Sequence, residues 1–313
     1  MKLSMTIDII CPLYNAEKYI KDLDAILKKQ KNVEIKNINY LLTESKDNTE
    51  NILKELNCKY EIIKKQEFSH SLTREKAAKK CTADILVFIT QDIHILNENW
   101  LHNLVGCIEN GECVASYSRQ ICSNKTIEKY TREKNYPEKS FITSEKDIEK
   151  MGLKVFFSSD ASAAIKRDIF IDLNGYDGKD LAASEDMYIT YKIITNGYKV
   201  KYCADSVVEH SHVLTLKQLY DRYYNIGAFF KENKFFNNYK VGKAGGGLAL
   251  YVLKRAIQDK NIKAIIRFVP DMSTRLIAKK MGEHFGKRNV NKKWISKILD
   301  VLLLWQHIME NNT

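Results

Sequence analysis

Polar and charged residues follow four successive apolar segments in the first third of the chain. Each apolar segment has the pattern of a buried strand, and ligands of parallel sheets bind at the carboxyl ends of the strands. Because these ends meet at one edge of the sheet, we expect the four groups to converge there. The groups are Pro12, Tyr14, Asn15 and Glu17; Ser45 and Asp47; His70 and Arg74; and Gln91, Asp92 and His94.

Asp186 follows Glu185 at the start of a predicted helix. One explanation for this pair is structural, since two acids in a first turn stabilise the positive end of a helix. The other is chemical, since a carboxylate within hydrogen-bond reach of a hydroxyl can take its proton as a general base. Asp160 lies just before a short predicted strand, and its position alone indicates a turn residue.

His210 and His212 are separated by one residue and follow a predicted strand. On an extended chain both rings point to the same side. Together with Asp92 they would complete a metal site. The alternative is a hydrogen-bonded surface pair that binds nothing.

The elements that must position these residues alternate between strands and helices. We expect a mostly parallel sheet covered by helices, which is an α/β fold. A polar, irregular stretch over 119–155 precedes the elements that carry Asp160 and Asp186. The predicted strands are 6–12, 39–43, 60–64, 84–90, 114–118, 161–166 and 199–204, and the predicted helices are 16–29, 47–56, 72–81, 97–109 and 185–196, with one more ending at 174–175.

From residue 214 onward the pattern is helical and rich in aromatic residues, so we place a domain boundary there: 1–213 and 214–313. The net charge of +11 comes mainly from residues 239–313, which hold 15 Lys and Arg against 5 Asp and Glu. Such helices can lie on an anionic membrane surface or pack against a second subunit. They can also simply present a solvated lysine-rich face.

Several classes of protein are disfavoured. No GxGxxG follows the first strand and no GxxxxGK[ST] is present, which argues against dinucleotide oxidoreductases and P-loop NTPases. No signature of a nucleic-acid-binding module occurs. The seven cysteines form no CxxC pair, so we expect reduced thiols. The apolar run at 301–305 is too short to span a bilayer, and we see no signal peptide. We therefore expect a cytoplasmic protein, soluble or peripheral to the membrane.

The order of these segments resembles glycosyltransferase family 2, which has the GT-A fold. The segments Phe68-Ser-His-Ser-Leu-Thr-Arg74 and Thr90-Gln-Asp92 are similar to those of its bacterial rhamnosyltransferase branch. The resemblance continues through Ser184-Glu-Asp186 and His210-Ser-His212. It extends into 216–227 and 278–288, and thus covers nearly the whole chain.

The resemblance implies a role for each matching residue. Asp186 would be the catalytic base, and a divalent cation, Mn²⁺ or Mg²⁺, would be held by Asp92 with His212 or His94. The family's usual pair of metal-binding carboxylates is reduced here to Gln91-Asp92-Ile-His94, with one carboxylate. The residues implied to contact the nucleotide-sugar are Pro12, Tyr14, Asn15, Glu17, Ser45, Asp47, Arg74, Gln91, Asp92, Asp160 and Glu185.

The implied activity is inverting transfer of a sugar from a nucleotide-diphosphate donor to a hydroxyl of a saccharide or lipid-linked saccharide, in cell-surface polysaccharide synthesis. The sugar would be rhamnose, with a dTDP- or UDP-sugar as donor. The single carboxylate of the metal motif motivates one alternative, a non-catalytic relative that binds nucleotide-sugars as a scaffold. A nucleic-acid-binding role, suggested by the basic tail alone, is disfavoured.

Overall fold

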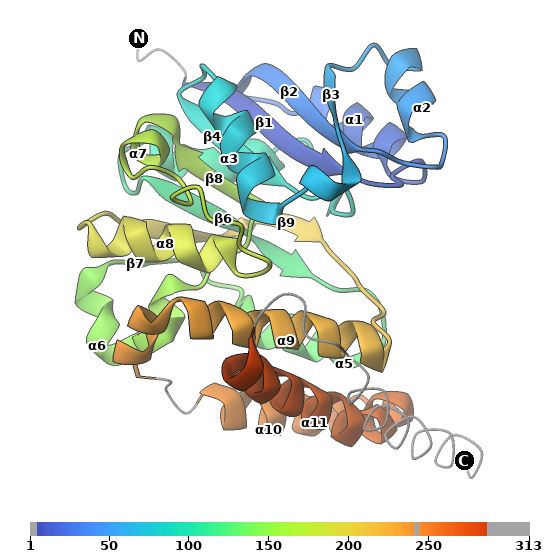
Figure 1. Cartoon of the computed structure of the whole chain (residues 1–313), viewed down its shortest axis with the longest axis vertical. Helices are drawn as coiled ribbons and strands as arrows, with labels where there is room; N and C mark the ends of the chain where they lie inside the picture. The colour runs from blue at the N-terminus through green and yellow to red at the C-terminus, as the bar shows by residue number, and fades with distance from the viewer. Residues whose placement is uncertain (1–4, 241–243, 287–313) are drawn as a thin grey trace. The chain divides into compact units, whose positions relative to one another are not determined.

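The chain was analysed as a computed structural model that describes residues 5–240 and 244–286 (Figure 1). These residues form two compact units. Unit 1 comprises Met1–Ile121, Tyr136–Leu181 and Glu185–His210, and unit 2 comprises Cys122–Asn135, Ala182–Ser184 and Ser211–Thr313, as far as they are described. The segment 122–135 thus belongs to unit 2, although it lies within the predicted domain 1–213. The run at 301–305 lies outside the described residues.

Unit 1 is built on a nine-stranded sheet with the order β3-β2-β1-β4-β8-β6-β9-β5, in which β7 also pairs with β9. Strands β3, β2, β1 and β4 are parallel, as are β6 and β9, while β8 runs antiparallel between β4 and β6. The strands are β1 (Thr6–Leu13), β2 (Glu34–Thr43), β3 (Tyr60–Ile63), β4 (Ile85–Ile89), β5 (His94–Ile95), β6 (Ala115–Ile121), β7 (Phe141–Thr143), β8 (Ser162–Lys166) and β9 (Val200–Glu209).

Helices cover this sheet, as predicted for an α/β fold (Figure 1). Alternate residues of β1, among them Ile7 and Ile9, join one apolar cluster with Leu23 of α1 and Trp100 of α4. Alternate residues share one cluster because successive side chains of a strand point to opposite faces of the sheet. The α-helices of unit 1 are α1 (Ile20–Lys28), α2 (Thr49–Glu55), α3 (His70–Lys80), α4 (Trp100–Glu109), α6 (Ile148–Met151), α7 (Arg167–Asp172) and α8 (Glu185–Thr195).

Strand β9 runs five residues beyond its predicted end at 204. Its pairing with β6 is interrupted after Ser118 and resumes at Arg119 opposite Val207. The extension delivers the chain to His210, whose backbone N–H donates to the carbonyl of Ile121. The predicted irregular stretch also contains regular structure, namely the end of β6, helix α5 (Ile127–Asn135), β7 and α6.

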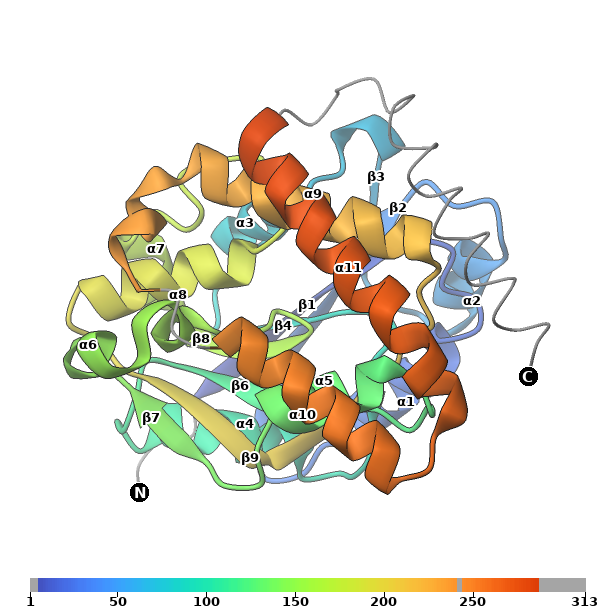
Figure 2. The same cartoon turned by 90° about the horizontal axis from the view of Figure 1, so that it is seen from below.

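Unit 2 consists of α5 with α9 (Leu216–Glu232), α10 (Ala244–Gln258) and α11 (Ile262–Phe285). Helices α9 and α11 cross at Gly227 and Gly282, where the two backbones are in direct contact (Figure 2). A Cβ at either position would collide with the backbone of the other helix. Glycine is therefore required at this crossing, since no side chain could be accommodated.

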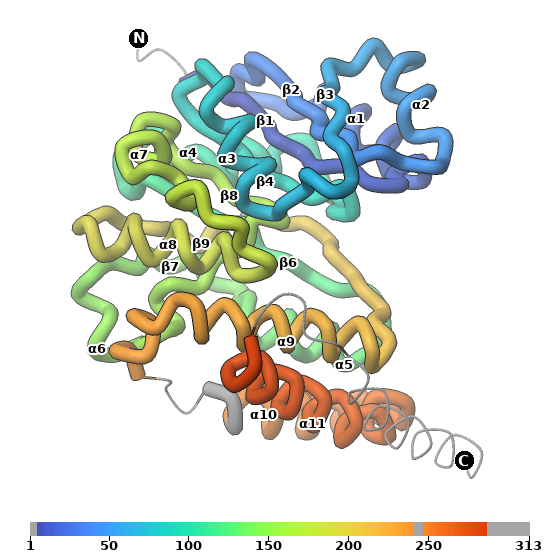
Figure 3. The backbone as a smooth tube through the Cα atoms, in the orientation of Figure 1, coloured from blue at the N-terminus to red at the C-terminus, as the bar shows by residue number. Residues whose placement is uncertain are grey.

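Helix α5 packs beside α10 within unit 2, although the two are far apart in sequence (Figure 3). Glu133 of α5 accepts a hydrogen bond from Arg255 Nε of α10 at 3.2 Å. Lys129 Nζ donates to Asp259 at 2.6 Å, just beyond the end of α10. No described helix is long and apolar enough to cross a membrane.

Candidate functional site

The loops after β1 and β2 hold each other through reciprocal hydrogen bonds. Asn15 adopts a left-handed backbone with φ 48°, and its N–H donates to Ser45 Oγ at 2.9 Å. Its side-chain carbonyl accepts from the Lys46 N–H at 3.1 Å. The N–H of Glu17 donates to Asp47 Oδ2 at 3.0 Å. The predicted residues of these two loops are therefore neighbours at the carboxyl edge of the sheet.

Gln91 ties the loop after β4 to the same edge. Its Oε1 accepts from the Tyr14 N–H at 2.7 Å, and its Nε2 donates to the Tyr14 carbonyl at 3.0 Å. Both ends of the amide are thus occupied by one residue of the neighbouring loop. The Tyr14 ring remains exposed, and its hydroxyl accepts from Lys65 Nζ at 3.0 Å. Pro12, next to the end of β1, pairs in register with Leu41.

The Asp47 carboxylate is stabilised in its charged form. Partial burial raises the pKa of Asp47, but the hydrogen bonds donated by Thr49 and by the Glu17 N–H lower it by more. The net shift of this pKa is therefore downward. Thr49 contributes two of these bonds, from its hydroxyl at 2.6 Å and its N–H at 3.2 Å. A carboxylate satisfied in this way holds loops in place and remains ionised.

A second group of acids surrounds Arg74, and we call it the acid cluster: Asp160 and Glu185, which are buried, and Asp186, which is half-buried. Arg74 is 2% exposed, and its Nη1 lies 3.5 Å from Glu185 Oε1. The same Nη1 donates to the carbonyl of His70 at 2.8 Å. The Tyr176 hydroxyl donates to Asp160 Oδ2 at 2.8 Å. These residues come from α3, from α8 and from the segments before β8 and α8, so the fold assembles them.

The acid cluster shifts the pKa of two aspartates upward. Burial is the main cause for Asp160, whose pKa is raised to about 6 although the Arg74 charge opposes the shift. Burial also raises the pKa of Asp186 well above its ordinary value, and the charges of Glu185 and Asp160 act in the same direction. Two carboxyls with raised pKa beside one buried guanidinium are typical of a functional site.

Backbone geometry presents Asp186 at the start of α8. Ser184, two residues earlier, has a positive φ of 61°, which is uncommon for a residue with a side chain. Asp186 Oδ1 accepts from the Met187 N–H at 2.7 Å. Ser158 Oγ donates to the Asp186 carbonyl at 3.1 Å and lies 2.6 Å from Thr190 Oγ1.

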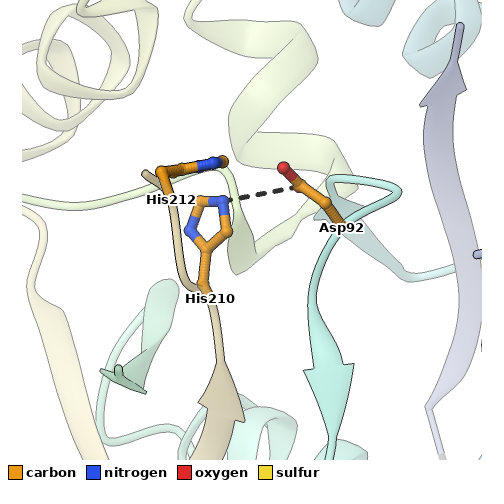
Figure 4. Close-up of side chains that lie close together, drawn as sticks. All are labelled: Asp92, His210 and His212. Carbon is orange, nitrogen blue, oxygen red and sulfur yellow. Dashed lines mark ion pairs between the residues drawn. The ribbon is translucent and has the colours of Figure 1, made fainter. Parts of the chain in front are cut away.

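The histidine pair meets Asp92. One ligand atom each from Asp92, His210 and His212 lies within 4.8 Å of the other two (Figure 4). The His210 Nε2 lies 3.4 Å from Asp92 Oδ1. Its other nitrogen, Nδ1, lies 2.9 Å from Gln120 Oε1, which orients the ring with Nε2 toward Asp92.

This donor set fits a divalent cation. One carboxylate and two imidazoles are the ligands that Mn²⁺ and related ions accept, and a three-ligand set leaves positions open for a substrate. His94, the other candidate ligand, is exposed on β5 opposite Glu209 and is not one of the three grouped residues.

Three residues at the site were not anticipated from the sequence. Gln120 orients His210, Tyr176 binds Asp160, and Lys65 contacts Tyr14. Gln120 lies near the end of β6 and is 1% exposed, and Tyr176 is fully buried. A buried polar group needs a hydrogen-bond partner, but this burial is visible only in the folded structure.

The arrangement offers three chemical capabilities at residues of known position. The acid cluster supplies a carboxyl whose raised pKa suits proton transfer near neutral pH. The Asp92–His210–His212 group supplies a cation site. The loops after β1, β2 and β4, which we call the edge loops, present the exposed Tyr14 ring and a backbone ordered by hydrogen bonds. Group transfer from a nucleotide can use all three features: a carboxyl that transfers a proton, a bound cation, and an aromatic ring on which the base stacks.

Residues 8–173 match the model of Glycosyl transferase family 2. The O-antigen chain rhamnosyltransferase RfbN of Salmonella typhimurium is 33% identical over 288 residues, which cover 90% of each chain. The O-antigen chain rhamnosyltransferase WbaN of Salmonella anatum is 32% identical over 246 residues, covering 78% of this chain and 77% of its own.

Solved structures share the fold. Residues 1–349 of S. aureus TarS align with a TM-score of 0.52 and 15% identity, covering 92% of this chain and 94% of theirs. The mannosyltransferase PcManGT of Pyrobaculum calidifontis, solved with GDP-Man and Mn²⁺, aligns with a TM-score of 0.52 and 14% identity, covering 96% and 80%. The α/β fold predicted from the sequence is confirmed. The chain belongs to glycosyl transferase family 2, and it is similar over most of its length to O-antigen rhamnosyltransferases.

Proposed function

We propose that the protein transfers a sugar from a nucleotide-diphosphate donor to an acceptor hydroxyl with inversion at the anomeric carbon. Asp186 is the proposed base. The observation that carries this proposal is the acid cluster, in which burial and two neighbouring acids raise the pKa of Asp186. A carboxylate of raised pKa is a stronger base than an ordinary aspartate.

In this mechanism the Asp186 carboxylate accepts the proton of the acceptor hydroxyl as the oxygen attacks the anomeric carbon. The attack comes from the face opposite the leaving diphosphate, so one displacement inverts the configuration. A divalent cation at Asp92, His210 and His212 would neutralise charge on the leaving group. Arg74 would also neutralise charge on the leaving group, because its buried Nε–H has no hydrogen-bond partner among the described residues.

The edge loops are the proposed donor site. The exposed Tyr14 ring offers a stacking surface for a base, and Asn15, Ser45, Asp47 and Glu17 fix the backbone around it. Rhamnose carried by dTDP is the first candidate donor, by similarity to the two O-antigen chain rhamnosyltransferases. UDP-sugars are the second, and S. aureus TarS has been solved with UDP-GlcNAc.

The proposed acceptor is a saccharide or lipid-linked saccharide used in cell-surface polysaccharide synthesis. Work on such an acceptor places the enzyme in the cytoplasm at the inner face of the membrane. Contact with that surface, or with a second subunit, is proposed for the basic helices of unit 2. Their exposed apolar residues support this, among them Leu250, Ile262 and Leu276 at 63–70% exposure.

The test is turnover of the Asp186→Asn variant with the donors above. We expect kcat to fall by about 10²–10⁴, the usual contribution of a general base, while donor binding is retained. Asp168→Asn is the matched control. Asp168 also stands in the first turn of a helix and also accepts from the next N–H at 2.7 Å, but it is exposed. Unchanged turnover of Asp186→Asn would refute its role as the base. Donor binding without any turnover by the unmodified protein would favour the scaffold alternative.

The metal proposal has a separate test. Mn²⁺ binding, followed by calorimetry or by electron paramagnetic resonance, should weaken at least about tenfold in Asp92→Asn and in His212→Ala. His94→Ala should bind Mn²⁺ as the unmodified protein does, because His94 lies outside the group. Equal loss in all three variants would contradict the assignment of ligands.

A further inference from the structure

Unit 2 contains a cavity of about 500 Å³ that is lined by lysines. Lys129 lines it from α5 and Lys125 from the segment before α5. Lys260 lines it from the turn between α10 and α11, and Lys263 from the first turn of α11. We call it the lysine pocket. None of the predicted site residues lies in it, and the proposed mechanism does not use it.

The pocket is held in shape by the turn itself. Lys260 has a left-handed backbone with φ 52°, which reverses the chain between α10 and α11. Asn261 Nδ2 then donates to the carbonyl of Lys125 at 2.8 Å and to the Tyr130 hydroxyl at 3.1 Å. One side chain thus ties together the two segments that carry the lysines, so the pocket exists before any ligand binds.

The charges in the pocket are unbalanced. Asp259 is the acid that lines it, and this carboxylate is shared by Lys129 at 2.6 Å and Arg255 at 3.5 Å. No ion pair links Lys125, Lys260 or Lys263 to an acid of the described residues. Three unneutralised ammonium groups around one cavity attract an anion of more than one charge, such as a phosphate.

Apolar residues are exposed beside the same turn. Ile262 lines the pocket and is 65% exposed, and Ile257, just before the turn, is 56% exposed. Leu250 lies seven residues before Ile257, and Val269 and Leu276 lie seven and fourteen after Ile262. Residues seven apart share one side of a helix, so each helix presents an apolar stripe to solvent. Figure 2 shows α10 and α11 leading into and out of this turn.

Charge distinguishes between the molecules that could cover this surface. The other acids of α10 and α11, Asp271 and Glu283, are also paired, with Arg275 and with Lys279 and Lys280. A second copy would bring like charges together, whereas a free phosphate would leave the apolar stripes uncovered. A membrane lipid satisfies both features, since it joins an anionic head group to an apolar chain.

We propose that the lysine pocket binds the phosphate head group of a membrane lipid, with Ile257 and Ile262 entering the acyl boundary. The proposal deepens the proposed function, because it rests on an enzyme that works on membrane-linked acceptors. The basic helices would attract an anionic membrane surface in general. The lysine pocket adds a defined site for one phosphate group.

The test uses the full chain and sedimentation with vesicles of phosphatidylcholine containing phosphatidylglycerol. The triple variant Lys125→Glu, Lys260→Glu, Lys263→Glu should bind about 100-fold more weakly, since each lysine near an anionic surface contributes about fivefold. The matched control is Lys139→Glu, Lys146→Glu, Lys150→Glu in unit 1, which changes the charge equally at exposed positions and should bind almost normally. Equal losses in the two variants would overturn the pocket as a site.

Three further measurements test the apolar contact, the source of the phosphate and the independence of the two proposals. Ile257→Ser with Ile262→Ser should also weaken vesicle binding, without changing the charge. Calorimetry with inorganic diphosphate should show weak binding; tight binding without vesicle binding would mean a soluble ligand and refute the lipid. Hydrolysis of the nucleotide-sugar donor should be unchanged in every pocket variant. If the unmodified protein did not hydrolyse the donor, this result would count against the proposed function and not against the pocket.

Discussion

Asp47 and Asp186 are the same residue type near the start of a helix, yet their pKa values shift in opposite directions. The pKa of Asp47 is lowered, because partial burial is outweighed by donation from Thr49 and from the Glu17 N–H. The pKa of Asp186 is raised, because burial is reinforced by Glu185 and Asp160 and opposed mainly by one N–H bond. The balance between burial and neighbouring acids on one side and hydrogen-bond donation on the other therefore decides the direction of the shift.

The difference extends to the regions around the two aspartates. The polar groups of the edge loops form hydrogen bonds with one another, and the Tyr14 ring is exposed. The acid cluster instead concentrates three carboxyls on one guanidinium, so its charges are incompletely compensated. We therefore expect the first region to be stable and pre-organised and the second to be costly to fold.

Removing Arg74 should have the largest effect on stability. In Arg74→Met the acids of the cluster lose their buried cation, and we expect the free energy of unfolding to fall by about 3–5 kcal/mol. Urea denaturation measures this. Lys80→Met on the same helix is the control, because Lys80 and Glu61 form an exposed pair and the change should stay within about 1 kcal/mol. Equal effects would mean that burial does not distinguish the two cations.

The pH dependence of stability should expose Asp160 next. Its folded pKa of about 6 lies above the ordinary value of 3.8, so the folded state favours the protonated form. This contribution is fully present below pH 3.8 and is lost as the pH rises through 6. Relative to Asp160→Asn, the native protein should lose up to about 3 kcal/mol between pH 4 and pH 7.5. Parallel stability curves for the two proteins would show that the carboxyl is ionised throughout.

Asp47→Ala should have the smallest of the three effects. It removes an acceptor for the Glu17 N–H and for Thr49, and we expect a loss of about 1–2 kcal/mol. The KM for the donor should rise several-fold while kcat changes little, because the loops orient the donor and take no part in proton transfer. Asp22→Ala, at an exposed first-turn position of α1, is the control. A fall in kcat with unchanged KM would place Asp47 in the chemistry.

Sequence patterns predicted β1 and β4 because both strands are mainly apolar. The segment 84–90 became β4 and 6–12 became β1, with ends shifted by one residue. The end of β9 was missed because its last residues, Val207 and Val208, pair with β6 only after an irregularity. Local sequence does not encode that shift; the partner strand does.

The site was predictable to the same extent. The spacing of His210 and His212 correctly placed the two rings near each other, and Asp92 joins them. Gln120 was beyond prediction because it reaches His210 through β6–β9 pairing, about ninety residues apart in the chain. The same holds for Tyr176, which approaches Asp160 from a loop. Contacts of this kind follow from tertiary structure, not from local periodicity.

Unit 2 is formed by segments that are far apart in the chain, and this has a consequence for biosynthesis. Helix α5 ends at residue 135, but α10, which supplies Arg255 for Glu133 and Tyr251 for the same carboxylate, ends at residue 258. A ribosome that adds 5–20 residues per second completes α10 roughly 6–25 s after α5. During that interval the nascent α5 exposes Ile127 and Tyr130, which are buried in the folded chain. The growing polypeptide therefore exposes the apolar side chains of α5 until their partners are made, which is the stage at which a chaperone would bind.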